Sequence, residues 1–144
     1  MVKNSRQWKL CGIVLAAMWA ICPAQVLAQV AVEKVIQARQ ANYFLMGQQM
    51  ARINATIKGD LAFDKASLQL SAEALDVLGR LVQGSYPPGS DQGSTKAKPE
   101  IWKDMARFKQ LALESQVEVA KLKETIQRGE LAAIKSAYGN ASKS

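Results

Sequence analysis

The chain has 144 residues, no histidine, two cysteines and a formal net charge of +7. Both cysteines, Cys11 and Cys22, lie near the N-terminus, so the rest of the chain cannot form a disulfide, a thiolate metal site or a cysteine nucleophile. The basic residues are scattered among acidic ones without interleaved aromatic side chains, a pattern that does not favour nucleic-acid binding. The carboxylates form no distinctive pair either, so we do not expect an enzyme.

Residues 1–28 have the pattern of a secretory signal peptide. Three basic residues precede an apolar run from Leu10 to Cys22, and Val26-Leu27-Ala28 provides the cleavage positions. The run is shorter than the roughly 20 residues that span a bilayer, which favours cleavage over a membrane anchor. We therefore expect a single mature domain of residues 29–144, exported to the bacterial periplasm and without membrane attachment after cleavage.

The mature chain has the periodicity of an all-α protein. Apolar residues spaced by three and four predict helices over residues 31–58, from the N-cap Asp64 to about residue 83, over residues 99–128, and over residues 130–138. Gly59, Gly84 and Gly129 are predicted to end the first three helices. Residues 85–96 are rich in proline, glycine and serine and predict a loop between the second and third helices.

The third helix has the most regular apolar face, with steps of four and three over about eight turns. Its members are Ile101, Met105, Phe108, Ala112, Ser115, Val119, Leu122 and Ile126. Such a face is typical of a helix packed along other long helices. We predict an antiparallel four-helix bundle whose shortened fourth helix leaves part of the other three uncovered.

Two residues on the predicted core face of the first helix are unusual there: Arg39 and Tyr43. Arginine is almost never fully buried unless it is paired. Arg39 therefore either packs its stem at the edge of the core with its head in water, or binds an acidic group of an enclosed ligand. Tyr43 is interpreted most simply as a core tyrosine with a satisfied hydroxyl.

The order of several motifs resembles the cytochrome c′ family across essentially the whole mature chain. These motifs are Ala38-Arg39-Gln40-x-x-Tyr43-x-x-Met46-Gly47, Pro87-Pro88-Gly89-Ser90, Ala97-Lys98-Pro99-Glu100-Ile101-Trp102, and the segment from Arg128 to Gly139. The Lys98–Trp102 stretch is the most specific of them. The resemblance implies a periplasmic four-helix bundle, often a homodimer, that encloses one c-type haem. It also implies electron transfer with a periplasmic redox partner and the binding of nitric oxide or carbon monoxide.

The resemblance further implies a set of haem contacts. Arg39 and Gln40 match the family's contacts to the haem propionates, and Tyr43 matches the position that covers the open face of the iron. Thr95 lies in a segment that approaches the haem edge, and Trp102 matches an aromatic residue of the core or pocket wall.

One part of the family pattern is absent. In the family, the fourth helix continues into Cys-x-x-Cys-His, whose cysteines bond the haem and whose histidine ligates the iron. This sequence stops at Ser144, about where that motif would begin. We therefore expect a family member that is cut short and cannot hold covalent haem. The alternative is a haem-less bundle that uses its uncovered face to dock a partner.

Overall fold

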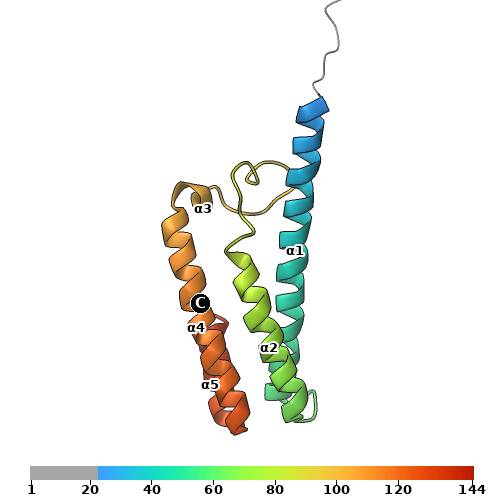
Figure 1. The fold of residues 1–144 in the computed structure, drawn as a ribbon. Coiled ribbons are helices and arrows are strands. Elements are labelled where there is room, and N and C mark those ends of the chain that lie inside the picture. The colour runs from blue at the N-terminus through green and yellow to red at the C-terminus, as the bar shows by residue number, and fades with distance from the viewer. Residues whose placement is uncertain (1–22) are drawn as a thin grey trace, which may run out of the picture.

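The computed structural model describes the backbone of residues 23–144 and the side chains of residues 31–144, so residues 1–22 of the expected signal peptide lie outside the described residues. The helices of the described part are α1 (Pro23–Lys58), α2 (Lys65–Val82), α3 (Glu100–Lys103), α4 (Met105–Arg128) and α5 (Leu131–Ala141). A long loop, residues 83–99, joins α2 to α3 at one end of the molecule (Figure 1).

Four of these helices form an antiparallel bundle, which confirms the predicted fold class. α1 contacts α2 and α5, and α4 contacts the same two helices, so the four close into a ring. Figure 1 shows that α5 is much shorter than α4 and that the C-terminus lies about halfway along α4. The end of the bundle that carries the long loop is therefore built from α1, α2 and α4 without α5.

The helix ends follow from local chemistry. The Asp64 carboxylate accepts a hydrogen bond of 3.1 Å from the Ala66 amide and caps the start of α2, as predicted. Gly59 and Gly129 have φ angles of 84° and 83°, the left-handed conformation that ends α1 and α4. The prediction for Gly84 was wrong: α2 already ends at Val82, and Gly84 is not among the glycines with positive φ.

The predicted continuous third helix is interrupted at Asp104. This residue has φ −134° and ψ 70°, which separates α3 from α4. Its carboxylate accepts a hydrogen bond of 2.9 Å from the Arg107 amide, so Asp104 caps a new helix instead of continuing the old one. The spacing between Ile101 and Met105 preserves the apolar period across the break, which explains why periodicity alone predicted one helix.

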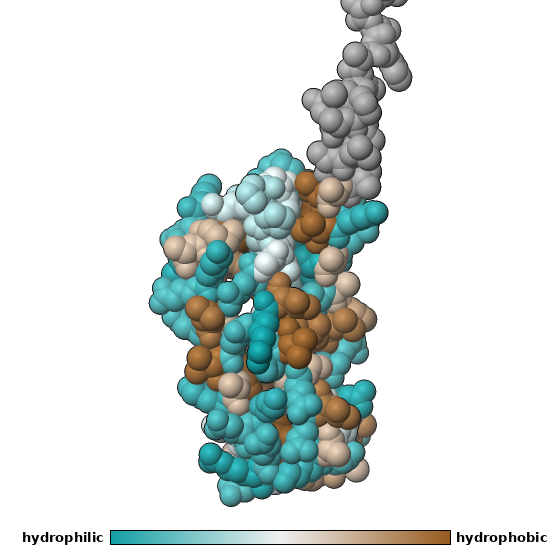
Figure 2. All heavy atoms as spheres, in the orientation of Figure 1, coloured by the Kyte–Doolittle hydropathy of each residue, from teal (hydrophilic) through white to brown (hydrophobic). Residues whose placement is uncertain are grey.

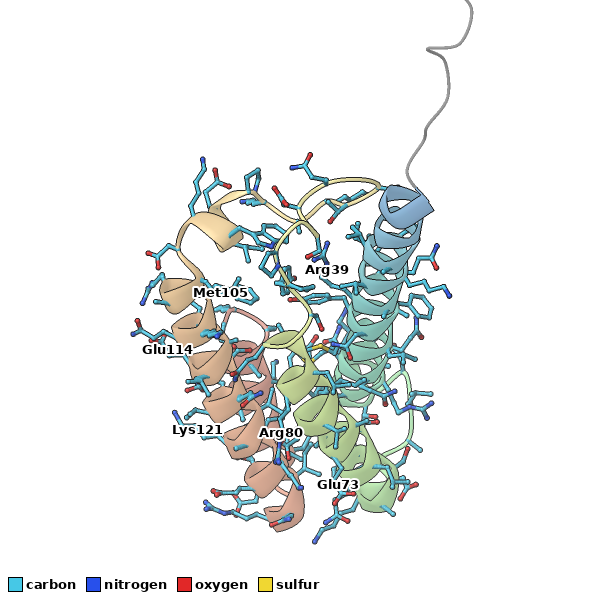
Figure 3. The ribbon with its side chains drawn as sticks, turned by 45° about the horizontal axis from the view of Figure 1, so that its top comes forward. Arg39, Glu73, Arg80, Met105, Glu114 and Lys121 are labelled. Atoms are coloured by element: carbon cyan, nitrogen blue, oxygen red, sulfur yellow. The ribbon has the colours of Figure 1, made fainter. Side chains whose placement is uncertain are left out.

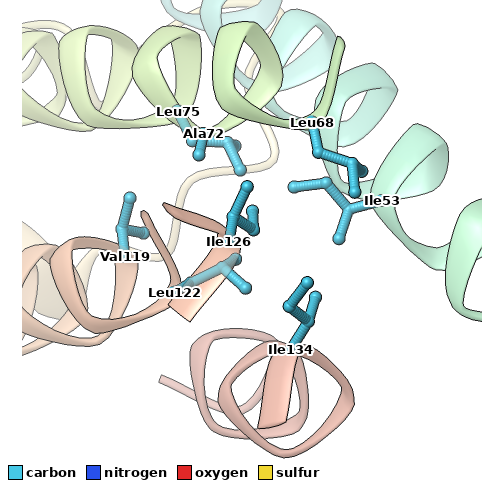
Figure 4. Packing of buried hydrophobic residues seen from close by; sticks show 8 residues of the cluster. All are labelled: Ile53, Leu68, Ala72, Leu75, Val119, Leu122, Ile126 and Ile134. Carbon is cyan, nitrogen blue, oxygen red and sulfur yellow. The ribbon is translucent and has the colours of Figure 1, made fainter. Parts of the chain in front are cut away.

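The hydrophobic core lies at the end of the bundle where α1, α2, α4 and α5 are all present. Figure 4 shows its side chains pointing toward one another from α1, α2, α4 and α5: Ile53, Leu68, Ala72, Leu75, Val119, Leu122, Ile126 and Ile134. Toward the long loop, the α4 residues Met105, Phe108, Ala112 and Ser115 are only half-buried. Because α5 is shorter than α4, the upper part of the α4 face is incompletely covered.

Apolar side chains also appear on the outside of the bundle, in patches among polar ones (Figure 2). Leu70, Val77 and Leu81 are exposed by 68%, 59% and 57%, and their spacing places them in one stripe along α2. No helix within residues 23–144 is both long and apolar enough to cross a lipid bilayer.

Candidate functional site

Arg39 is buried beneath the long loop, with only 4% of its surface exposed (Figure 3). Its Nη1 donates hydrogen bonds to the Ser85 carbonyl at 3.2 Å and to Ser90 Oγ at 3.4 Å. Its Nη2 donates to the Ser90 carbonyl at 3.1 Å and to Thr95 Oγ1 at 2.7 Å. A single guanidinium therefore fixes three points of the loop to α1. The alternative that its head lies in water is wrong.

Aromatic rings enclose the same guanidinium. The Arg39 Cζ lies 4.5 Å from the centroid of the Tyr86 ring and 5.5 Å from that of Trp102. Tyr86 in turn makes edge-on contacts with Trp102 at 5.5 Å and with Phe108 at 4.6 Å between centroids. These contacts stabilise a cation that has left water, and they join the loop to α4.

Arg39 has no acidic partner among the described residues. The five ion pairs within 4.0 Å in this part of the chain involve other cations, and every acceptor of Arg39 is an uncharged oxygen. Uncharged acceptors compensate a buried charge less well than a carboxylate does. The loop end of the bundle therefore carries a positive charge that is only partly compensated, which favours the approach of an anion.

A cavity of about 490 Å³ opens beside this charge, and we call it the Arg39 cavity. Its walls are Arg39, Gln40, Tyr43, Tyr86, Thr95, Lys96 and Ala97. Gln40 Nε2 donates to the Ser94 carbonyl at 2.9 Å, so Gln40 also holds the loop. Thr95 Oγ1 accepts from Arg39 and from the Ala97 amide, at 2.7 Å and 3.1 Å, which leaves its own O–H to donate to a ligand.

The structure thus brings four of the five predicted site residues, Arg39, Gln40, Tyr43 and Thr95, to one cavity. Trp102 is not among its walls. The Trp102 Nε1 donates to the Pro87 carbonyl at 3.1 Å, and its ring packs against Tyr86. Trp102 therefore packs on the wall residue Tyr86 from outside the Arg39 cavity and lines a separate surface hollow.

A second cavity of about 310 Å³ lies between α1, α2 and α4, and we call it the inter-helix cavity. Its walls are mainly apolar: Tyr43, Met46, Gly79, Val82, Phe108, Leu111, Ala112, Ser115, Gln116, Val119 and Ser144. Ser144 Oγ donates to Ser115 Oγ at 3.3 Å where the chain reaches this space. Tyr43 lines both cavities, which makes it the wall between a charged space and an apolar one.

The interpretation of Tyr43 as a core residue was wrong, although its hydroxyl is satisfied. Tyr43 is 45% exposed and lines both cavities. Its hydroxyl accepts a hydrogen bond of 3.3 Å from the Tyr86 hydroxyl. The Tyr43 side chain is therefore directed at the cavities and not at the packed core.

The sequence patterns did not predict a role for Tyr86, which contacts Arg39, Tyr43, Trp102 and Phe108. Burial raises the pKa of Tyr86 well above its ordinary value, the hydrogen bond to Tyr43 adds to this, and the charge of Arg39 opposes it. Tyr86 is therefore a neutral hydroxyl donor at all ordinary pH values. Its sequence signal was a single aromatic residue directly before two prolines, within a loop otherwise made of small and polar residues.

The residues present fit only one end of a haem. Arg39, Gln40 and Thr95 offer a cation and hydrogen-bonding groups of the kind that suits the propionates of a haem. At the iron, the fit fails: residues 23–144 contain no cysteine and no histidine, and the described part of the chain holds no metal-ligating cluster of histidine, cysteine, aspartate and glutamate.

Comparisons with known proteins place the chain in a family. The sequence model of the family described as cytochrome C′ matches residues 34–144. The chain is 32% identical over 108 residues to the cytochrome c′ of Alcaligenes xylosoxydans xylosoxydans, covering 75% of this chain and 84% of that protein.

Solved structures agree with this result. The cytochrome c prime of Shewanella frigidimarina superposes with a TM-score of 0.73 at 28% identity, over 78% of this chain and 88% of that one. The nitric oxide complex of a variant cytochrome c prime from Alcaligenes xylosoxidans superposes with a TM-score of 0.71 at 30% identity, over 78% and 87%. This is a family of haem proteins without enzymatic activity, as expected from the carboxylate pattern. The four-helix bundle described above belongs to the cytochrome c′ family.

Proposed function

We propose that the Arg39 cavity and the inter-helix cavity together receive a haem, whose propionates meet Arg39, Gln40 and Thr95. A haem held there would supply an iron for single-electron transfer and for the binding of nitric oxide or carbon monoxide. The observation that carries the proposal is the buried Arg39, a cation without an acidic partner among the described residues, at the mouth of a cavity. A ligand carboxylate would compensate this charge better than the loop oxygens do.

We further propose that these 144 residues hold haem without a covalent bond. Residues 23–144 offer no thiol for a thioether and no imidazole for the iron. Among the walls of the inter-helix cavity, Tyr43 and Met46 carry donor atoms suited to iron, and both are weak anchors. The DNA beyond codon 144 tests the expected truncation directly: an in-frame or adjacent Cys-x-x-Cys-His codon set supports it, and its absence contradicts it.

The test of haem binding is a spectrum after expression of the full chain with the machinery that attaches haem to c-type cytochromes. We expect a Soret band on adding haemin to the purified protein, and complete loss of colour from the protein on extraction with acid acetone. Colour that stays with the protein would contradict the non-covalent assignment. A protein that gives no Soret band with excess haemin would contradict haem binding itself.

A haem-less binding protein is the second candidate, because one observation favours it. All four Arg39 hydrogen bonds are formed within the chain, so the loop is held in place without any ligand. This candidate predicts a stable, colourless bundle whose stability does not change when haemin is added. A haem-binding protein gains unfolding free energy with ligand concentration, since the ligand binds the folded state only.

We also propose that the protein acts in the periplasm as a homodimer. The signal-like N-terminal pattern supports the location, and the exposed α2 stripe of Leu70, Val77 and Leu81 supports a contact between two copies. A solved cytochrome c′ of the same fold, 26% identical with a TM-score of 0.70, shows ligand-controlled dimer dissociation. Sedimentation of wild type against Val77→Glu tests this: a dimer that the charge converts to a monomer is expected, and a wild-type monomer contradicts it.

A further inference from the structure

Tyr43 separates the Arg39 cavity from the inter-helix cavity, and among the described residues it is the only one that lines both. A ligand that places its carboxylates at Arg39 and its apolar body between the helices must cross the position of this side chain. We propose that the Tyr86 hydroxyl is a positioning group that holds Tyr43 in this dividing position, so that a planar apolar ligand with carboxylates enters only when their hydrogen bond opens. The inference rests on the proposed function, whose haem belongs to this ligand class.

The two tyrosines are held very differently. Tyr86 is 8% exposed, and its ring is fixed by Phe108, Trp102 and the Arg39 guanidinium. Tyr43 is 45% exposed, and the hydrogen bond from Tyr86 is the only one that its side chain makes among the described residues. Tyr86 is therefore the fixed partner, and Tyr43 is the side chain that moves when the contact breaks.

The hydrogen bond between Tyr86 and Tyr43 is weak enough to break when a ligand enters. Its oxygen–oxygen distance of 3.3 Å is longer than the 2.7–2.8 Å that is usual for O–H···O bonds, so the bond is weak. Burial raises the pKa of Tyr86, which keeps the proton that Tyr86 donates. The net contribution of one such bond corresponds to a factor of about two to ten in the population of the closed arrangement.

The first test needs no ligand. The chain contains three tyrosines, Tyr43, Tyr86 and Tyr138, so a protein labelled with 3-fluorotyrosine gives three ¹⁹F signals. Tyr86→Phe removes one hydroxyl and keeps the ring that packs on Arg39 and Phe108. We expect the Tyr43 signal to sharpen and move toward the value of free fluorotyrosine. The matched control Tyr138→Phe removes a hydroxyl elsewhere and should leave the Tyr43 signal in place. An unchanged Tyr43 signal in Tyr86→Phe overturns the proposal.

The second test measures the rate at which a probe, protoporphyrin IX, enters the purified protein, by stopped-flow fluorescence. We expect Tyr86→Phe to bind it about two to ten times faster than wild type, and Tyr138→Phe to bind at the wild-type rate. Equal rates for wild type and Tyr86→Phe overturn the proposal. Tyr43→Phe breaks the same bond from the other side and should also bind faster, which keeps the test valid if Tyr86→Phe folds poorly.

The two tests separate the inference from the function on which it rests. If wild type, Tyr86→Phe and Tyr43→Phe all fail to bind the porphyrin, the proposed function is contradicted, and entry of such a ligand is overturned with it. The ¹⁹F signals still decide whether Tyr86 positions Tyr43. If the probe binds at equal rates while the Tyr43 signal moves, the proposed function stands and the partition is overturned.

Discussion

Replacing Arg39 by methionine removes the central connection between α1 and the long loop while keeping a side chain of similar length. Two of its acceptors, the carbonyls of Ser85 and Ser90, have no other hydrogen-bond donor among the described residues. Thr95 Oγ1 would keep the Ala97 amide as a donor, and Ser90 Oγ would still donate to the Pro87 carbonyl. The substitution therefore leaves two main-chain carbonyls without a hydrogen-bond donor among the described residues.

The size of the loss follows from these contacts. An unsatisfied buried carbonyl costs about 1–3 kcal/mol, with the fully buried Ser90 at the upper end and the half-buried Ser85 at the lower. Losing the stacking on Tyr86 adds about 0.5–1 kcal/mol. Removing a buried charge that has no acidic partner among the described residues offsets part of this. We expect a net loss of about 3 kcal/mol in the free energy of unfolding, which is large for a single domain.

Urea denaturation followed by circular dichroism measures this loss. Arg80→Met is the matched control, because Arg80 is exposed and its one ion pair within the described part of the chain is with Asp76 one turn away, a contact worth about 0.3–0.5 kcal/mol. Arg39→Lys separates charge from geometry: an ammonium cannot span the three loop positions, so most of the loss should remain. If Arg39→Met costs no more than Arg80→Met, Arg39 does not hold the loop and the reasoning is refuted.

Three further changes have expected outcomes in the same denaturation assay. Ile126→Ala removes a buried core side chain and should lower the free energy of unfolding by about 2–5 kcal/mol. Leu113→Ala, at an exposed position, should lower it by about 0.5 kcal/mol or less. Equal losses would contradict the core described above. Gly129→Ala, at a φ of 83°, should lower the free energy of unfolding by about 1 kcal/mol. Gly47→Ala, inside α1 with open space around it, should raise the free energy of unfolding by about 0.5–1 kcal/mol. Changes of the same sign would contradict the assigned end of α4. Because the folded-state pKa of Tyr86 is raised above its ordinary value of 10, its contribution to stability is complete below pH 10 and falls as the pH rises further. Tyr86→Phe has no hydroxyl to ionise, so the difference in free energy of unfolding between wild type and this variant should shrink above pH 10. A difference that stays constant with pH would contradict the raised pKa.

Much of the fold was predictable because its signals are local. The apolar spacing of three and four residues, the Asp64 cap and the glycines at positions 59 and 129 each report a backbone preference that the packing does not override. The break at Asp104 was not predictable from periodicity, since the apolar residues keep their spacing on both sides of it. Only the capping preference of an aspartate inside the run indicated a helix start there.

The site was predictable in part, for a different reason. Arg39 stood out as a charged residue on an apolar face, which is the pattern that a buried polar function produces. The contribution of the long loop could not be read from the sequence, because Ser85, Ser90 and Thr95 meet Arg39 only through tertiary contacts across 46 to 56 residues. Tyr86 was missed for the same reason: nothing local distinguishes a loop tyrosine that becomes buried from one that stays in water.

The central claim is that the buried charge of Arg39 receives the carboxylates of a haem-like ligand. An equilibrium titration with protoporphyrin IX and with its dimethyl ester tests this most directly, since the two probes differ only in those carboxylates. We predict binding of the diacid, with the ester and the Arg39→Met variant each weaker by about ten- to a hundredfold, the loss of one charge-assisted hydrogen-bonded contact. Equal affinity for the diacid and the ester, or the absence of binding by the diacid, would contradict the claim.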